Sequence, residues 1–167
     1  MKNNKLLILG AGQYGFVAKE TAQAMNCFVS IDFLDDRNEL AVGKLADYEK
    51  LHDEYACAFV AIGNPELRRT LLQGLEQCGY ALPVLIHPQA TVMPSAKIEK
   101  GSIVEAQAVV NSNAVVGFGC IISAGAVINH NSCLGAVCHV DCNATVPARS
   151  VLPEGTKVLC GTVYEET

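Results

Sequence analysis

The sequence predicts two folds in series: a small α/β domain with a parallel sheet, followed by a parallel β-helix. Strand-like and helix-like segments alternate in the first half of the 167-residue chain, which is typical of a parallel sheet. In the second half an aliphatic residue falls on every sixth position, which is typical of a repeat architecture. We expect the α/β domain to span residues 1–83 and the β-helix to span residues 84–167.

Five segments define the expected α/β domain. The strands are apolar runs, and the second helix begins at Asn64 and Pro65, which suit a helix start. The expected strands cover residues 5–9, 27–34 and 58–63, and the expected helices cover residues 16–25 and 66–79. About 80 residues hold only one such half, so a mononucleotide fits this domain better than NAD.

A glycine-rich turn follows the first strand. Gly10, Gly12 and Gly15 form the pattern GxGxxG, whose backbone N–H groups can face a phosphate at a helix N-terminus. Asp35 and Asp36 follow the second strand, where a carboxylate can accept a hydrogen bond from a ribose hydroxyl. Gly63 and Asn64, at the carboxyl end of the third strand, are expected to line the same crevice. The alternative is a tight turn with no ligand.

Two columns of residues define the repeat. The probability of thirteen consecutive aliphatic residues at this spacing by chance is on the order of 10⁻⁷. The large column is Ile86, Val92, Ile98, Val104, Val110, Val116, Ile122, Ile128, Leu134, Val140, Val146, Leu152 and Val158. Four residues after each of the first twelve comes a small side chain, from Ala90 through Ala108 and Cys138 to Thr156. One large and one small inward position per six residues describe a strand and a turn, three of which close one coil. About four coils are expected.

The residues one position before each member of the large column predict how the protein assembles. They include an apolar series expected to form an exposed stripe, namely Ile103, Val109, Val115, Ile121 and Val127. Such a stripe predicts self-association, and a prism with three faces can form a closed trimer. The alternative is that the first domain covers it.

Charge and cysteine usage exclude several classes of protein. The net charge is −5, and no run of Lys or Arg suits nucleic acid or an anionic membrane. The first apolar stretch is too short for a signal peptide, so we expect a cytoplasmic protein whose eight cysteines are reduced. Cys133, Cys138, His139 and Cys142 raise the alternative of a zinc site, but no CxxC pair is present and we expect no metal.

The four histidines differ in their expected positions. His52 and His87 have no polar cluster around them in the sequence and are interpreted as structural, whereas His130 falls on an exposed corner and His139 on an outward strand position. A histidine accepts a proton near neutral pH, so His130 is a candidate general base. Nine residues are half of one coil, so His130 and His139 should point to different sides of the prism and would meet best across a subunit interface.

The motifs GAGQYG, FLDDR, AIGN, LIHPQATV and VINHNSCLGAVCHV, in that order, resemble the NeuD/PglD-like bacterial sugar acyltransferases. The resemblance covers nearly the whole chain. It implies a Rossmann-like domain that binds a UDP-linked amino sugar or a related sugar. It also implies a left-handed β-helix that forms a homotrimer and binds acetyl-CoA between subunits.

The resemblance also implies roles for individual residues. His130 corresponds to the catalytic base, followed by Asn131 where the family has an acidic residue. His139 corresponds to a histidine near the thioester, where it would hold the oxyanion, and Ala148 to a glycine beside acetyl-CoA. The nucleotide-sugar site corresponds to Gly12, Gln13, Tyr14, Asp35, Asp36 and Gly63.

Three functions therefore stand open. The leading one is an acetyl-CoA-dependent acetyltransferase that acts on a nucleotide-linked sugar for surface glycan synthesis. The second is a catalytically weak nucleotide-sugar-binding protein, because of Asn131, Ala148, Ser123 in place of an asparagine, and a shorter series of coils after Val146. The third is an NAD-dependent enzyme, which depends only on the glycine motif.

Overall fold

The structure is a computed structural model that describes residues 4–166. The chain divides into two compact units, residues 1–83 and 84–167. No helix among residues 4–166 combines the length and the apolar character that a membrane crossing needs.

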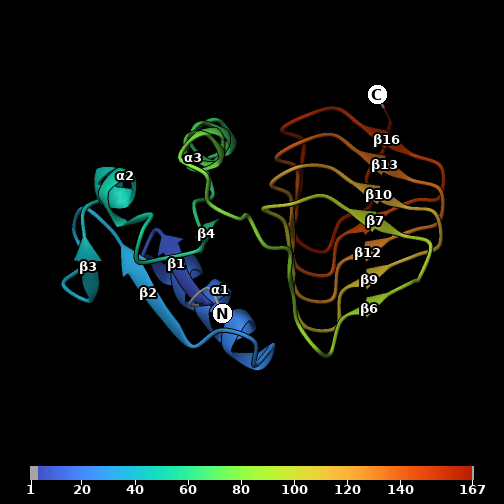
Figure 1. Cartoon of the computed structure of the whole chain (residues 1–167). Coiled ribbons are helices and arrows are strands. Elements are labelled where there is room, and N and C mark those ends of the chain that lie inside the picture. Colours follow the sequence, from blue (N-terminus) through green and yellow to red (C-terminus); the bar gives the residue numbers. More distant parts are fainter. Residues whose placement is uncertain (1–3, 167) are drawn as a thin grey trace. The chain divides into compact units, whose positions relative to one another are not determined.

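The first unit is built on a parallel four-stranded sheet in the order β3-β2-β1-β4 (Figure 1). The strands are β1 (Lys5–Leu9), β2 (Ser30–Leu34), β3 (Ala41–Gly43) and β4 (Cys57–Val60). The helices are α1 (Gln13–Ala24), the 3₁₀ turn η1 (Leu45–Asp47), α2 (Tyr48–Leu51) and α3 (Pro65–Gln77). The alternation of strands and helices predicted from the sequence is confirmed.

The apolar run of β1 explains why this strand lies inside the sheet. Leu6 to Leu9 are fully buried, and β2 and β4 pair with β1 on either side. Helix α1 begins at Gln13, three residues before the expected start, because the turn after β1 is tight and Gly12 is already the N-cap. The sequence pattern missed β3, η1 and α2, which are too short to show a periodicity.

The second unit is a left-handed parallel β-helix (Figure 1). Its strands have two residues each and form three parallel sheets of four, five and four strands. One sheet holds β6 (Thr91–Val92), β9 (Val109–Val110), β12 (Val127–Ile128) and β15 (Thr145–Val146). The second holds β7 (Lys97–Ile98), β10 (Val115–Val116), β13 (Cys133–Leu134) and β16 (Val151–Leu152). The third holds β5 (Leu85–Ile86), β8 (Ile103–Val104), β11 (Ile121–Ile122), β14 (His139–Val140) and β17 (Lys157–Val158).

Residues eighteen apart stack in successive coils. Val110 pairs with Ile128, and Ile128 pairs with Val146. Both inward columns predicted from the period lie in one hydrophobic core, in which Val116, Ile122, Ala126 and Ala144 are fully buried. Buried hydroxyls of the small column donate to backbone carbonyls, Ser102 to Gly117 at 3.0 Å and Ser132 to Pro147 at 2.8 Å, so neither hydroxyl is left unsatisfied in the core.

The predicted single apolar stripe is wrong. Ile103 and Ile121 lie on one sheet, Val109 and Val127 on another, and Val115 on the third. The period of six residues advances the chain by one face, and only a period of eighteen returns it to the same face. Ile103 and Ile121 are also buried rather than exposed, with 0% and 1% of their surface accessible.

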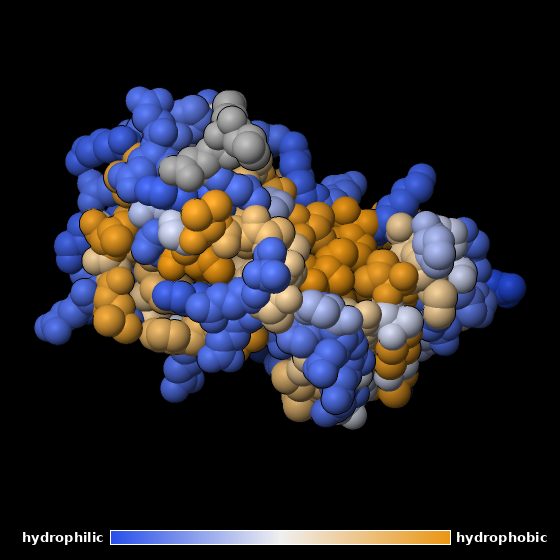
Figure 2. Space-filling model, turned by 60° about the horizontal axis from the view of Figure 1, so that its bottom comes forward, coloured by the Kyte–Doolittle hydropathy of each residue, from blue (hydrophilic) through white to orange (hydrophobic). Residues whose placement is uncertain are grey.

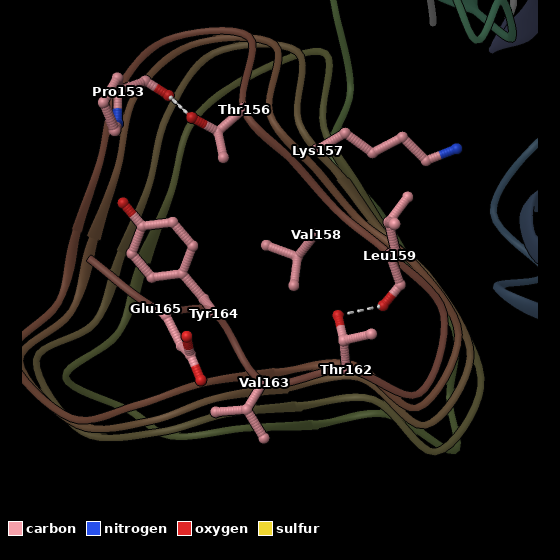
Figure 3. Close-up of a pocket in the computed structure, with 9 residues that line it drawn as sticks. All are labelled: Pro153, Thr156, Lys157, Val158, Leu159, Thr162, Val163, Tyr164 and Glu165. Carbon is pink, nitrogen blue, oxygen red and sulfur yellow. Dashed lines mark hydrogen bonds between the residues drawn. The ribbon is translucent and has the colours of Figure 1, made fainter. Parts of the chain in front are cut away.

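The last coil shows the triangular cross-section of the β-helix in an end-on view (Figure 3). Val158 points inward and the ring of Tyr164 lies over the interior, whereas Lys157 and Val163 point outward. Thr156 and Thr162 close two corners by donating to the carbonyls of residues 153 and 159 at 2.6 and 2.7 Å. Hydrophobic surface remains around these coils, since Val151, Leu159 and Val163 are each more than half exposed.

Apolar side chains also reach the surface of the first unit. Val29, Leu40 and Val42 are the most exposed of its large hydrophobic side chains within the described residues. Figure 2 shows such apolar patches between hydrophilic side chains on one face of the protein. Leu40 lies at the end of the loop after β2, which bears on the candidate site.

Candidate active site

The three glycines of the turn after β1 have different structural roles. A Cβ on Gly10 would lie 2.9 Å from the Ala61 carbonyl oxygen, and Gly10 has a φ of +104°. A Cβ on Gly15 would lie 2.2 Å from the Gly10 carbonyl oxygen, so only glycine lets α1 approach β1 this closely. A Cβ on Gly12 would meet nothing within 4 Å, and its φ is −74°. The fold therefore requires glycine at positions 10 and 15. It does not require glycine at position 12, where a side chain would point into open space.

Asp35 ties this turn to the loop after β2. Its Oδ2 accepts a hydrogen bond from the Ala11 amide at 2.8 Å, and its Oδ1 accepts from the Arg37 and Asn38 amides at 2.8 and 3.0 Å. The Ala11 bond, followed by the Arg37 bond, holds the pKa of the Asp35 carboxyl below its usual range. The sequence predicted Asp35 as a ribose acceptor, and the structure adds that both carboxylate oxygens already fix the loop.

An open cleft of about 360 Å³ lies at the last coil, and a larger one of about 680 Å³ lies beside the glycine-rich turn. The larger cleft is lined by Ala11, Gly12, Asp35 and the segment from Arg37 to Leu40. Asn38 shapes it by donating from Nδ2 to the Ala11 carbonyl at 2.6 Å. The cleft therefore joins the glycine-rich turn to the loop that Asp35 fixes.

Other residues predicted for this site lie outside the cleft lining. Gln13 is exposed on the first turn of α1, and Tyr14 is half-buried. Asp36 is exposed and accepts a hydrogen bond from the Leu45 amide at 3.1 Å. Gly63 follows β4, which pairs with β1, and a Cβ on Gly63 would meet nothing within 4 Å. Gly63 and Gly12 thus share the property that folding does not require glycine at either position.

Arg37 and Asn38 are cleft residues that the sequence analysis did not select. Arg37 stands in the motif FLDDR beside the two acidic residues, and this position in the sequence could have indicated that it lines the cleft. Asn38 gave no signal, because its part in the cleft depends on a hydrogen bond to Ala11 across 27 positions of the chain.

His130 lies on an exposed corner of the β-helix between β12 and β13. Asn131 adopts a left-handed conformation with φ +58°, and its Nδ2 lies 2.8 Å from His130 Nδ1. The His130 carbonyl accepts a hydrogen bond from the Arg149 amide in the next coil at 3.1 Å. Since Val127 pairs with Thr145, Ala148 occupies the corner position of the next coil that corresponds to His130.

The Asn131 amide determines which nitrogen of His130 can act. When Nδ2 donates to Nδ1, the neutral ring carries its proton on Nε2. When the amide is rotated by 180°, Oδ1 accepts from Nδ1–H and Nε2 has a free lone pair. The second arrangement is the one a general base requires, and unlike a carboxylate the amide orients the ring without a stabilising charge.

His139 lies on β14 in a different environment. Its Nε2 lies 3.2 Å from Ser123 Oγ and 3.9 Å from Asp141 Oδ1, and its side chain is 19% exposed. Burial raises the pKa of Asp141, but the Cys142 amide and the neighbouring His139 and Lys157 outweigh burial, so the pKa of Asp141 is lowered. His139 is therefore a partly buried imidazole with a hydroxyl on one side and a carboxylate nearby.

The two histidines lie on opposite sides of the coil. His130 is on the corner that joins the sheet of β12 to the sheet of β13, and His139 is on the third sheet. One chain does not bring His130 and His139 together.

The cysteines around His139 are also separated by the coil. Cys133 is exposed on the sheet of β13, Cys138 is buried in the core, and Cys142 lies on a corner. Cys138 instead donates from Sγ to the Pro153 carbonyl. Between residues 4 and 166, no group of three or more His, Cys, Asp or Glu side chains is placed to hold a metal ion.

Comparisons with known proteins cover both units. A model of the PglD N-terminal domain matches residues 5–75. The acetyltransferase domain of PglB from Neisseria gonorrhoeae FA1090, in complex with acetyl coenzyme A, is 31% identical, with a TM-score of 0.85 over 96% of this chain and 93% of that chain. Another structure of that domain has a TM-score of 0.89 at 31% identity and covers 98% of this chain and 92% of that chain.

PerB from Caulobacter crescentus, in complex with CoA and GDP-perosamine, is similar at 24% identity with a TM-score of 0.68. The match covers 96% of this chain and 91% of that chain. At this identity the similarity extends to the fold.

Proposed function

Since this chain belongs to the NeuD/PglD-like family of sugar acyltransferases, we propose that it acetylates a nucleotide-linked amino sugar with His130 as the general base. The chain is a sugar acetyltransferase, and acetyl-CoA is its acyl donor. The observation that carries the proposal is the exposed His130 ring, which Asn131 holds at 2.8 Å on a corner of the β-helix.

The proposed reaction needs one base and one oxyanion donor. With Oδ1 of Asn131 facing Nδ1–H, His130 Nε2 takes a proton from the sugar amine as the amine nitrogen bonds to the acetyl carbon. The imidazole of His139 donates to the oxyanion that forms, and the oxyanion collapses as the carbon–sulfur bond breaks. The CoA sulfur leaves with the proton that His130 had taken from the amine, which returns His130 to its neutral form. A primary amine attacks a thioester readily, so positioning and one base suffice.

We propose that the acyl donor binds at the corner of His130. Ala148 stands at the same corner one coil further, where the family resemblance has a glycine beside acetyl-CoA, and alanine is the smallest side chain that could replace it. The acetyl-CoA complex of the PglB domain is covered over 93% of its length by this chain. That coverage weakens the alternative in which too few coils leave no site for acetyl-CoA.

We place the sugar nucleotide in the cleft beside the glycine-rich turn. Gly12 and Gly63 allow close approach of the diphosphate, and Gln13 and Tyr14 lie at the start of α1 next to it. Asp35 and Asp36 hold the loop that borders the cleft. A mononucleotide fits this single βαβ half, and family membership favours an acetyltransferase over an NAD-dependent enzyme.

We propose a homotrimer in which His130 of one chain and His139 of a neighbour form one site. The proposal depends on the opposite placement of the two side chains within a chain. We also propose a cytoplasmic location, because the cytoplasm supplies acetyl-CoA and sugar nucleotides and keeps cysteine thiols reduced.

The test is acetyl transfer from acetyl-CoA to UDP-linked and GDP-linked amino sugars, followed by release of the CoA thiol. His130→Ala should lower kcat by about 10² to 10⁴-fold. Ser112→Ala is the matched control, because Ser112 occupies the corresponding exposed corner one coil earlier. Unchanged turnover in His130→Ala would exclude His130 as the general base. Sugar-nucleotide binding without turnover in the wild type would favour the second candidate, a catalytically weak nucleotide-sugar-binding protein. Asn131 is the observation that favours this candidate, because an amide cannot stabilise the imidazolium by charge.

A further inference from the structure

Arg68 is the largest fully buried side chain of the described residues, at 1% exposure. It is the fourth residue of α3, whose N-cap is Asn64. Arginine is almost never fully buried without partners, and side chains in the first turn of a helix point back toward its N-terminus. Arg68 follows this direction and reaches the loop between β4 and α3.

The guanidinium of Arg68 holds two consecutive carbonyls of that loop. Its Nη1 donates to the Ile62 carbonyl at 2.9 Å and to the Gly63 carbonyl at 3.0 Å. In a trans peptide the C=O and N–H groups point in opposite directions. Because both carbonyls face the buried guanidinium, the N–H groups of Gly63 and Asn64 face away from it.

The outward side of this loop is free to contact a ligand. Gly63 is exposed, its Cβ position is open to 4 Å, and Gly12 on the neighbouring strand end has the same property. Within residues 4–166 the amides of Gly63 and Asn64 make no hydrogen bond to the protein. The Asn64 side chain caps α3 by accepting from the Leu67 amide at 2.9 Å, so the loop is fixed at both ends.

Arg68 also brings a positive charge to the N-terminal end of α3. The N-terminus of a helix is already the positive end of its dipole, where a cation is unfavourable. A guanidinium in this place adds to the positive potential at the carboxyl end of β4, and a diphosphate bound there would be favoured by both.

We infer that Arg68 is a positioning residue for the sugar nucleotide, which orients the Ile62–Asn64 loop so that Gly63 and Asn64 present their N–H groups to the diphosphate. The inference rests on the proposed function. Arg68 itself does not touch the ligand.

The experiment measures Kd by calorimetry for UDP, GDP and acetyl-CoA in the full chain. Arg68→Met should weaken binding of the nucleoside diphosphate about tenfold, with Arg68→Lys in between because it keeps the charge and a donor. The Kd for acetyl-CoA should stay unchanged. Leu72→Ala is the matched control, since it removes a fully buried side chain from the same helix away from the loop. It should lower the Tm and leave both Kd values unchanged.

Gly63→Ala keeps the inference testable if Arg68→Met does not fold. The added methyl group has room in the protein, so the Tm should hold while nucleoside diphosphate binding weakens. Combined with Arg68→Lys, its effect should be less than multiplicative, because both changes act on one loop. Unchanged nucleotide Kd in Arg68→Lys and Arg68→Met, or equal weakening in Leu72→Ala, would overturn the inference. A wild type that binds neither UDP nor GDP would instead overturn the proposed nucleotide site.

Discussion

The α/β unit and the β-helix place their candidate functional residues by different physical means. In the α/β unit, Asp35 and Asn38 hold one loop through individual hydrogen bonds that cross more than twenty positions of the chain. In the β-helix, the corner of His130 repeats at Ser112 and Ala148, and the backbone is nearly the same at each. The comparison teaches that a repeat lets function arise from one exceptional side chain, whereas the α/β site needs a loop of matched contacts.

Substitutions at Gly15 and Gly12 should have the largest and most different effects on stability and binding. Gly15→Ala forces a methyl group to within 2.2 Å of the Gly10 carbonyl oxygen and should destabilise the protein by about 3 kcal/mol in denaturant unfolding. Gly12→Ala meets no atom within 4 Å and should leave stability unchanged while weakening binding of UDP or GDP. Equal losses of stability in both variants would contradict the separation of structural and ligand-facing glycines.

Asp35→Asn tests the loop in the α/β unit. Hydrogen bonds lower the pKa of Asp35 from 3.8, so its carboxylate contributes stability above that pH and loses it as the pH falls through the lower folded-state value. The variant should cost about 1 kcal/mol at pH 7, after allowance for solvent screening, and the difference from the wild type should vanish at acid pH. Urea unfolding at several pH values measures the difference in free energy of unfolding between the variant and the wild type. A difference that persists at low pH would contradict a stabilising role of the ionised Asp35 carboxylate.

Asn131→Asp changes the single side chain beside His130 on the β-helix. A carboxylate beside Nδ1 stabilises the imidazolium and strengthens His130 as a base, so kcat should rise roughly threefold to tenfold. Asn113→Asp is the control, because Asn113 has the same φ of +58° one coil earlier and no histidine beside it. An equal change in both variants would show that surface charge, rather than His130, is responsible.

The sequence predicted the β-helix well because each of its residues has a position fixed by the period. Val116 and Ala126 fell in the core as the columns required. The stripe that included Val109 and Val115 failed, because a period of six residues does not return to the same face. Handedness and family came from the resemblance and not from the period.

The α/β site was less predictable, because its contacts are not periodic. The apolar runs revealed β1, β2 and β4, but nothing in the residue order showed that Asp35 bonds to the Ala11 amide. Arg68 was hidden for a related reason, since an arginine in an amphipathic helix is normally a surface residue. Its role depends on carbonyls that only the fold brings to it.

We propose that His130 and His139 act together although one chain holds them on opposite sides of its coil. The most direct measurement is the activity of mixed oligomers, in which His130→Ala and His139→Ala chains with different tags are co-expressed and purified through both tags. In a mixed cyclic trimer one interface of three pairs the two intact histidines, so we predict about a third of the wild-type activity, well above either variant alone. Activity no higher than that of the separate variants would contradict a site shared between chains.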